Sequence, residues 1–316
     1  MTTPPPALAT TTTAPGTPLD DGKIKVQTPL QRFVSDFCES PTALVGLASF
    51  TIIALAAIFA AVIAPQNPYD LAQLDIMDSQ LPPGESSLLA GYTYLLGTDD
   101  QGRDMFSAIL YGLRISLLVG SLSVVVALIV GTAVGLVAAY FGGTVDTLLM
   151  RFVDIQLSFP SILVALILLA IFGNGVDKVI IALIIVQWAY YARAVRGTAL
   201  VERRKEYIEA AACLALPHRR LLFKHLLPNC LPPLIVIATV QIANSIALEA
   251  TLSFLGVGVP ITEPSLGLLI ANGFEYMMSG RYWISFFPGI ALVVTIMAIN
   301  LMGDQLRDVL NPRLQK

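Results

Sequence analysis

The sequence predicts an all-α integral membrane protein with six transmembrane helices and both termini in the cytoplasm. Of its 316 residues, 55% are hydrophobic and only 13% are charged, whereas soluble proteins contain about 25% charged residues. The apolar residues form long uncharged stretches, and a stretch of about 20 crosses a hydrocarbon core. Lipid is therefore the expected solvent for most of the chain. The net charge of −3 gives no reason to expect a nucleic acid as a partner.

Six uncharged stretches are long enough, or nearly so, to span the membrane. They comprise residues 40–69, 115–145, 155–176, 179–192, 226–248 and 282–303. The fourth is short, but Arg193 and Arg196 at its end can extend it, because long side chains reach the membrane surface. The third should begin earlier as a helix, since Arg151 and Asp154 lie one turn apart and can form an ion pair.

The distribution of lysine and arginine determines the expected orientation, because cytoplasmic loops carry an excess of these residues. With the N-terminus inside, the outer side keeps only Arg103, Arg114, Lys178 and Arg281. The inner side receives Lys23, Lys25, Arg32, Arg151, Arg193, Arg196, Arg203, Arg204, Lys205, Arg219, Arg220, Lys224, Arg307, Arg313 and Lys316. Both termini are therefore predicted to be cytoplasmic.

The chain divides into an N-terminal tail, residues 1–36, and a transmembrane domain, residues 37–316. The tail opens with a Pro/Thr/Ala-rich stretch, Thr2 to Pro18, which cannot bury a core and should be mostly disordered. The segment Gln31–Phe37 is either a short amphipathic turn on the membrane surface or a linker. We do not interpret the first span as a signal peptide, because about 40 residues precede it.

Catalytic and metal-binding motifs are missing from the sequence. Cys38, Cys213 and Cys230 have no metal-ligand spacing, so we expect three reduced thiols and no metal. The phosphate loop G-x-x-x-x-G-K-[ST] does not occur. We therefore expect a chain that binds no cofactor and catalyses no reaction.

The outer loop, about residues 65–114, is long and acidic. Loops of this length are usually functional or disordered. Thr98-Asp-Asp-Gln101 has the spacing of a capping box, which predicts a short helix there. Its acids are either helix caps and solvated surface or a docking site for an external partner. The candidate docking residues are Asp99, Asp100, Arg103 and Asp104.

The inner segment, about residues 197–225, contains two short helical blocks on either side of Leu216-Pro217. The first block places Tyr207, Ala210, Ala211 and Leu214 on one helical face. This small, alanine-lined face suits close docking against another protein. The second block alternates basic and apolar residues, which is typical of an anchor on the membrane surface.

The fifth predicted span carries a polar stripe. Gln241, Asn244, Ser245 and Glu249 lie at helical spacing on one face. Polar groups facing lipid are costly, so the stripe should face protein or water. It either forms hydrogen bonds between helices or lines a path for a polar solute. Glu249 would then attract the ammonium group of an entering solute or pair with a gate.

Several motifs give the chain a specific resemblance. The inner segment, with Glu206-Tyr-Ile-Glu-Ala-Ala211, Leu214-Ala-Leu216 and His225-Leu-Leu-Pro-Asn229, resembles the EAA loop of ABC importer permeases. Further matching stretches are Leu96-Gly-Thr-Asp-Asp-Gln-Gly-Arg-Asp104, Tyr140-Phe-Gly-Gly-Thr-Val-Asp146, Leu157-Ser-Phe-Pro160, Leu252-Ser-Phe-Leu-Gly256 and Gly303-Asp-Gln-Leu-Arg-Asp308-Val-Leu-Asn-Pro-Arg313. Together they resemble the C-type permease subunit of dipeptide and oligopeptide importers (DppC/OppC type, in the peptide/nickel group) over roughly residues 30–316.

The resemblance implies the ABC type I importer permease fold and a set of partners. These are a second permease subunit, two ATPase domains that bind ATP and Mg²⁺, and an extracytoplasmic solute-binding protein, all at a bacterial inner membrane. The EAA loop would insert into the ATPase as a coupling helix. The residues assigned to this coupling are Glu206, Tyr207, Glu209, Ala210, Ala211, Leu214, Ala215 and Leu216.

One residue departs from the family pattern, and the substrate stays open. The family usually has glycine where this chain has Ala215, so Ala215 must either fit a right-handed turn or be strained. Short peptides are the implied solute, but nickel complexes, opines or another small solute would use the same machinery. An ion-driven transporter would place ionisable groups in mid-membrane and show repeats, whereas these spans are nearly free of charge. A structural or regulatory membrane protein is the third possibility.

Overall fold

The computed structural model describes residues 28–70, 74–87, 91–260 and 262–310, and these are predominantly helical. Five helices are long and apolar enough to span a membrane. They are α2 (Pro41–Ile58), α4 (Met105–Phe141), α7 (Val176–Glu202), the helix His218–Phe254, most of which is α10 (Leu227–Phe254), and α12 (Trp283–Val309). The bent pair α5 (Gly143–Ser158) and α6 (Ser161–Phe172) passes the same test together. The predicted all-α membrane fold is confirmed, with five such helices, or six when the bent pair is counted as one span.

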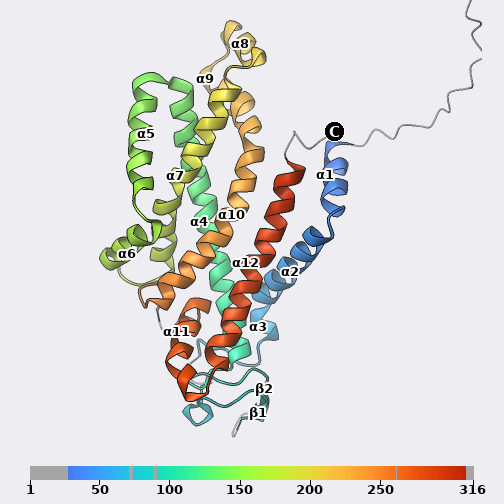
Figure 1. Ribbon diagram of the computed structural model, residues 1–316, viewed down its shortest axis with the longest axis vertical. Coiled ribbons are helices and arrows are strands. Elements are labelled where there is room, and N and C mark those ends of the chain that lie inside the picture. The colour runs from blue at the N-terminus through green and yellow to red at the C-terminus, as the bar shows by residue number, and fades with distance from the viewer. Residues whose placement is uncertain (1–27, 71–73, 88–90, 261, 311–316) are drawn as a thin grey trace, which may run out of the picture.

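The two predicted loops lie at opposite ends of the molecule. Figure 1 shows α8 (Glu206–Cys213) at one end of the long axis. The short strands β1 (Glu85–Ser86) and β2 (Thr93–Tyr94), which pair antiparallel, and helix α11 (Leu266–Tyr276) lie at the other end. We call these the α8 end and the hairpin end. The ends of α1 (Pro29–Cys38) and α12 are joined where Gln305 Nε2 donates to the carbonyl of Asp36 at 3.2 Å.

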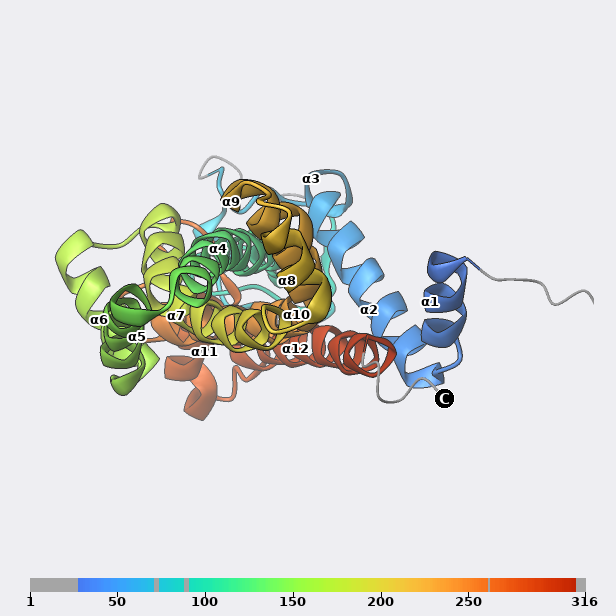
Figure 2. The same ribbon diagram turned by 90° about the horizontal axis from the view of Figure 1, so that it is seen from above.

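Helix α4 lies in the middle of the bundle, between α2 at one edge and α5 and α6 at the other (Figure 2). It packs closely on α7 because glycines remove side chains from the interface. A Cβ atom at Gly131 would meet the carbonyl oxygen of Trp188 at 2.3 Å, and one at Gly135 would meet that of Ala192 at 2.5 Å. Helices that approach so closely are held together by van der Waals contact over a long surface.

The third predicted span is not one straight helix. α5 and α6 are bent by 89°, and the break falls at Phe159 and Pro160. Phe159 is extended, with φ −95° and ψ 141°. A proline lacks an amide hydrogen and pushes the preceding residue toward extended geometry, so the helix ends there.

The fourth span is much longer than predicted, and its arginines do not end it. α7 has 27 residues, and Arg193 and Arg196 pair with two acids of α5. Arg196 Nη2 lies 2.6 Å from Asp146 Oδ2, and Arg193 Nη2 lies 2.5 Å from Asp154 Oδ1. The predicted pair of Arg151 with Asp154 is therefore wrong. Contact between two helices of the same chain, which a linear sequence does not reveal, supplies the partner.

Three shorter segments either differ from the prediction or decide between two predicted structures. Gln31–Phe37 lies inside α1, which Thr28 caps together with Gln31, so this segment is helical. The stretch from Thr2 to Pro18, predicted to be disordered, lies outside the described residues. The second basic block is no separate anchor, because α9 (His218–Arg220) and the π-helix η3 (Leu221–Leu226) continue into α10. α11 was not predicted, although Ser265 caps it by accepting from the amide of Leu268 at 3.2 Å.

The remaining elements are short and lie toward the hairpin end. α3 (Ala60–Ile63) follows α2, η2 (Ile76–Asp78) belongs to the outer loop, and η4 (Met277–Ser279) follows α11. α11 fits tightly between α10 and α12. A Cβ atom at Gly267 would meet the carbonyl oxygen of Ala250 at 2.2 Å, and one at Gly273 would meet the amide nitrogen of Ser285 at 2.3 Å.

Candidate functional site

Helix α8, at the tip of the α8 end, exposes one side and buries the other. Ile208 and Ala211 are buried, and Ile208 packs in a cluster with Leu226 and Cys230 beneath it. The exposed residues of the predicted coupling segment are Glu206, Tyr207, Glu209, Ala210, Leu214 and Ala215, while Leu216 is half-buried. The prediction that Ala211 shares the exposed face is therefore wrong, because Ala211 is buried against the rest of the chain. Ala210 keeps the position predicted for it.

The break after α8 is made by Ala215 in a left-handed conformation, with φ 51°. Of the two alternatives for this residue, strain rather than a right-handed turn is confirmed. An L-residue with a Cβ atom is disfavoured there by roughly 1–2 kcal/mol. The amide of Leu216 closes the turn by donating to the carbonyl of Ala211 at 3.4 Å, and Pro217 follows in extended geometry.

The base of α8 contains polar contacts that were not predicted from the sequence. The Tyr207 hydroxyl donates to Glu202 Oε1 at the end of α7, and it accepts from Asn229 Nδ2 of α10 at 2.9 Å. Burial and the hydrogen bond to Glu202 raise the pKa of Tyr207 to about 12. Glu202 precedes the EAA-like motif and Asn229 is its last residue, so only the fold brings them together.

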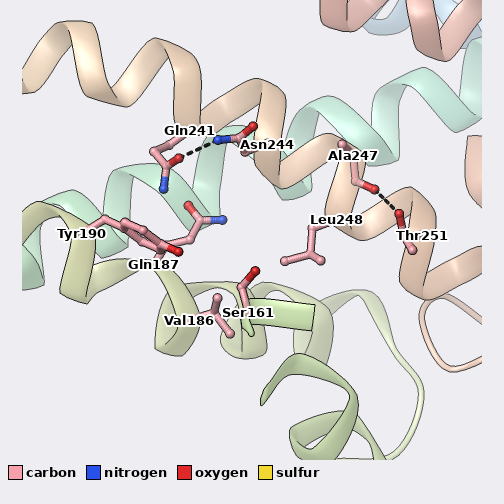
Figure 3. A pocket seen from close by; sticks show the side chains of 9 residues that line it. All are labelled: Ser161, Val186, Gln187, Tyr190, Gln241, Asn244, Ala247, Leu248 and Thr251. Atoms are coloured by element: carbon pink, nitrogen blue, oxygen red, sulfur yellow. Dashed lines mark hydrogen bonds between the residues drawn. The ribbon is translucent and has the colours of Figure 1, made fainter. Parts of the chain in front are cut away.

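A polar cavity of about 360 Å³ lies between α6, α7 and α10 (Figure 3). It is lined by Ser161, Val186, Gln187, Tyr190, Gln241, Asn244, Ala247, Leu248 and Thr251. Asn244 Nδ2 donates to Gln241 Oε1 at 2.8 Å, so these two amides form a pair along one wall. Hydrogen-bonding groups of this kind can replace water around a polar solute.

The predicted polar stripe of the fifth span divides between its two interpretations. Gln241 and Asn244 line the cavity. Ser245 and Glu249 are instead fully buried between helices. Gln187 Nε2 donates to Ser245 Oγ at 2.6 Å, and Ser116 Oγ of α4 donates to Glu249 Oε2 at 2.9 Å. Ser245 and Glu249 therefore hold helices together, as the interhelical interpretation states.

A second cavity, of about 710 Å³, opens between α10 and α12 toward the α8 end. It is lined by Glu202, Lys205, Asn229, Pro232, Pro233, Val236, Ile237, Val240, Gln241, Gly303, Asp304, Arg307 and Leu310. Gln241 lines both cavities. The two spaces therefore follow one another along α10, from the middle of the helix to its N-terminal end.

The outer loop is folded around its acids instead of displaying them. Asp99 Oδ2 and Arg103 Nε form an ion pair at 2.6 Å, with exposed side-chain fractions of 0% and 1%. Asp104 caps α4, since its Oδ2 accepts from the amide of Ser107 at 2.9 Å. The helix predicted to begin at Thr98 is absent, because Thr98 Oγ1 donates instead to the carbonyl of Asp78 at 2.5 Å.

These contacts change how the predicted docking residues can act. Asp99, Arg103 and Asp104 are buried, so they cannot touch a partner while the loop is folded. Asp100 is half-buried, and burial, followed by the nearby charge of Asp99, raises its pKa. Any docking at this end must use other residues of the loop.

Metal ligands do not gather in the part of the chain that the structure describes, where no group of three or more His, Cys, Asp or Glu side chains has a metal-binding arrangement. The absence of a bound cofactor stays a prediction.

Comparisons with known proteins identify the family to which this chain belongs. Residues 131–316, more than half of the chain, match the family described as binding-protein-dependent transport system inner membrane component. Residues 28–83 match the N-terminal TM domain of oligopeptide transport permease C. The chain is 43% identical over 289 residues to the dipeptide transport system permease protein DppC of Escherichia coli K12, covering 92% of this chain and 95% of that protein.

Another relative and a solved structure agree with this match. The di/tripeptide transport system permease protein DppC of Pseudomonas aeruginosa UCBPP-PA14 is 38% identical over 299 residues, covering 94% of this chain and 97% of that protein. A chain of the inward-facing MetNI methionine ABC transporter shares the fold at a TM-score of 0.54 and 21% identity, covering 66% of this chain and 98% of that one. The chain therefore belongs to the binding-protein-dependent transport system inner membrane component family, as a multi-pass membrane protein.

Proposed function

We propose that this chain is the permease subunit of an ATP-driven ABC importer that carries short peptides into a bacterial cell. It forms the translocation path with a second permease, and it hydrolyses no ATP itself. Two partner ATPase domains bind ATP and Mg²⁺, and an extracytoplasmic binding protein delivers the peptide. The names of the curated relatives support the substrate class.

The observation that carries the proposal is the exposed side of α8, which projects beyond the membrane-spanning helices (Figure 1). Ala210 lies on this side, and its small methyl side chain permits a partner to approach the helix closely. Glu209 beside it offers a carboxylate for a charge-assisted hydrogen bond. In this proposal α8 faces the cytoplasm, where ATP is available, and both termini lie on the same side.

The path follows α10 in this proposal. Gln241 and Asn244 present amide groups to the first cavity, and Gln241 also borders the second. A peptide backbone carries amide donors and acceptors, so side-chain amides match it chemically. The polar cavity would be completed by the second permease, because one chain alone leaves the cavity open.

The experiment is to purify the chain with its co-expressed ATPase and second permease, comparing wild type with Ala210→Asp. We expect the aspartate to hold the ATPase surface away, so that the amount of ATPase recovered falls at least about tenfold and peptide uptake stops. Ser279→Asp, at an exposed position near the hairpin end, is the matched control and should retain both. Normal ATPase recovery with Ala210→Asp, or peptide uptake that persists without any ATPase subunit, would contradict the proposal.

A further inference from the structure

The hydroxyl of Tyr207 joins three helices at one point. It lies on α8, donates to Glu202 Oε1 at the last residue of α7, and accepts from Asn229 Nδ2 near the start of α10. Glu202 is buried although it is charged. Its other oxygen, Oε2, lies 2.8 Å from Lys205 Nζ in the turn that leads into α8. Both carboxylate oxygens therefore point to the α8 connection.

Asn229 extends this network into the unusual start of the fifth span. Its Nδ2 atom also donates to the carbonyl of His225 at 2.7 Å, inside the π-helix η3. Both amide hydrogens are thus in use, one toward α8 and one toward η3. Single π-helical turns are rare and are often found at functional sites.

Apolar packing alone would hold α8 in place without fixing its angle. Ile208 packs against Leu226 and Cys230, and such contacts are non-directional, so the surfaces can slide. Hydrogen bonds require alignment of donor and acceptor. The Tyr207 network therefore supplies the directional part of the attachment.

The two helices joined to α8 are two of the three that line the polar cavity. α7 provides Gln187 and Tyr190, and α10 provides Gln241 and Asn244. Glu202 and Asn229 also border the second cavity. A change in the position of α8 reaches both walls through the same hydroxyl group.

We propose that Tyr207, with Glu202 and Asn229, is the positioning group that converts displacement of α8 into joint movement of α7 and α10. This inference rests on the proposed function, because it assumes that a partner moves α8. It assigns Tyr207 an inward role, in place of the outward contact expected from its position in the motif. Glu202, which lies outside the motif, and Asn229, at the end of the motif, both gain a specific role.

The test uses the assembled importer in proteoliposomes and measures peptides transported per ATP hydrolysed. Tyr207→Phe keeps the ring and removes the hydroxyl. We expect the ratio to fall roughly fivefold, the factor that one hydrogen bond of ordinary strength represents. The amount of ATPase bound should stay near wild type, because Glu209 and Ala210 on the exposed side of α8 are unchanged.

A double-mutant cycle identifies the network as the cause. Asn229→Ala should lower the ratio to a similar extent, and the double variant Tyr207→Phe/Asn229→Ala should be no worse than either single variant. Tyr282→Phe is the matched control, since this tyrosine lies at the hairpin end and its hydroxyl makes no hydrogen bond within the described residues. It should leave the ratio unchanged.

The outcomes separate this inference from the proposed function. If wild type binds no ATPase, the proposed function fails. If wild type couples normally and Tyr207→Phe transports as many peptides per ATP, the positioning role is refuted while the proposed function stands. If the two single variants lower the ratio and their effects add fully, the residues act separately and the inference is also refuted.

Discussion

The two ends of the molecule use charged loop residues in opposite ways. At the hairpin end, Asp99, Arg103 and Asp104 are buried and satisfy one another or the start of α4. At the α8 end, Glu206 and Glu209 are exposed, and the buried positions of α8 are taken by Ile208 and Ala211. These charged residues of the hairpin end are thus paired within the chain, whereas the charged residues of α8 lie on a side of the helix that is exposed to solvent. A surface whose side chains are exposed and make few contacts within the chain, more than the presence of charges, indicates where another protein binds.

The largest expected effect comes from breaking the ion pair at the hairpin end. Asp99→Ala leaves the guanidinium of Arg103 buried without its carboxylate, which costs about 3–5 kcal/mol. We expect the purified protein in detergent to unfold at a markedly lower temperature, with rapid proteolysis of the outer loop.

Asp100→Asn is the matched control for this change. Because the pKa of Asp100 is raised by burial and then by Asp99, the charged form is disfavoured in the folded state. The charged Asp100 carboxylate therefore lowers stability at neutral pH, and this penalty disappears as the pH falls through the raised pKa. The asparagine should remove this pH dependence without lowering stability at neutral pH. Equal losses for the two variants would show that the pair is not the stabilising feature.

The next effect sharpens the contrast between polar residues of α10 that line the cavity and polar residues that neighbouring helices cover. In a background without native cysteines, single cysteines at 241 and 244 should react with a small water-soluble thiol reagent at least about tenfold faster than cysteines at 245 and 249. The reason is that Gln241 and Asn244 line the cavity, whereas Ser245 and Glu249 are covered by α7 and α4. Labelling at 241 and 244 should also change with nucleotide state. Uniform labelling at all four positions would remove the distinction.

The smallest effect compares strained backbone at the two ends. Ala215 and Gln80 are the described non-glycine residues with positive φ, at 51° and 59°. Glycine at either position should relieve about 1 kcal/mol of strain. We expect Ala215→Gly and Gln80→Gly each to raise the midpoint of thermal unfolding by a few degrees. If Ala215→Gly lowers it, the left-handed turn after α8 is not strained.

The sequence predicts the number of spans and the ends at which the loops lie because lipid imposes a strong requirement on length and charge. It fails where a partner comes from another helix. Arg193 looked like the end of a span because its partner, Asp154, lies on α5. Ala211 looked exposed because helical spacing groups residues on a face without showing what that face packs against.

The candidate site shows the same limit. The spacing in the sequence placed Gln241 and Ser245 on one face of a helix, and both residues do lie four positions apart in α10. Whether each faces a cavity or a neighbouring helix depends on Gln187, which is 54 and 58 residues away in the sequence, respectively. Ala215 is the exception: its departure from the family glycine named backbone strain as one of two alternatives before the fold was considered.

The central claim is that the exposed side of α8 is covered by the ATPase, and the native Cys213 on α8 tests it directly. Cys213 and Cys38 are exposed, while Cys230 is buried. The rate at which Cys213 reacts with a water-soluble maleimide is measured in the chain alone and in the assembled complex, with Cys38 as the internal reference. We predict that assembly slows labelling of Cys213 at least about tenfold and leaves the labelling rate of Cys38 unchanged. Equal labelling of Cys213 in an intact, ATP-hydrolysing complex would contradict it.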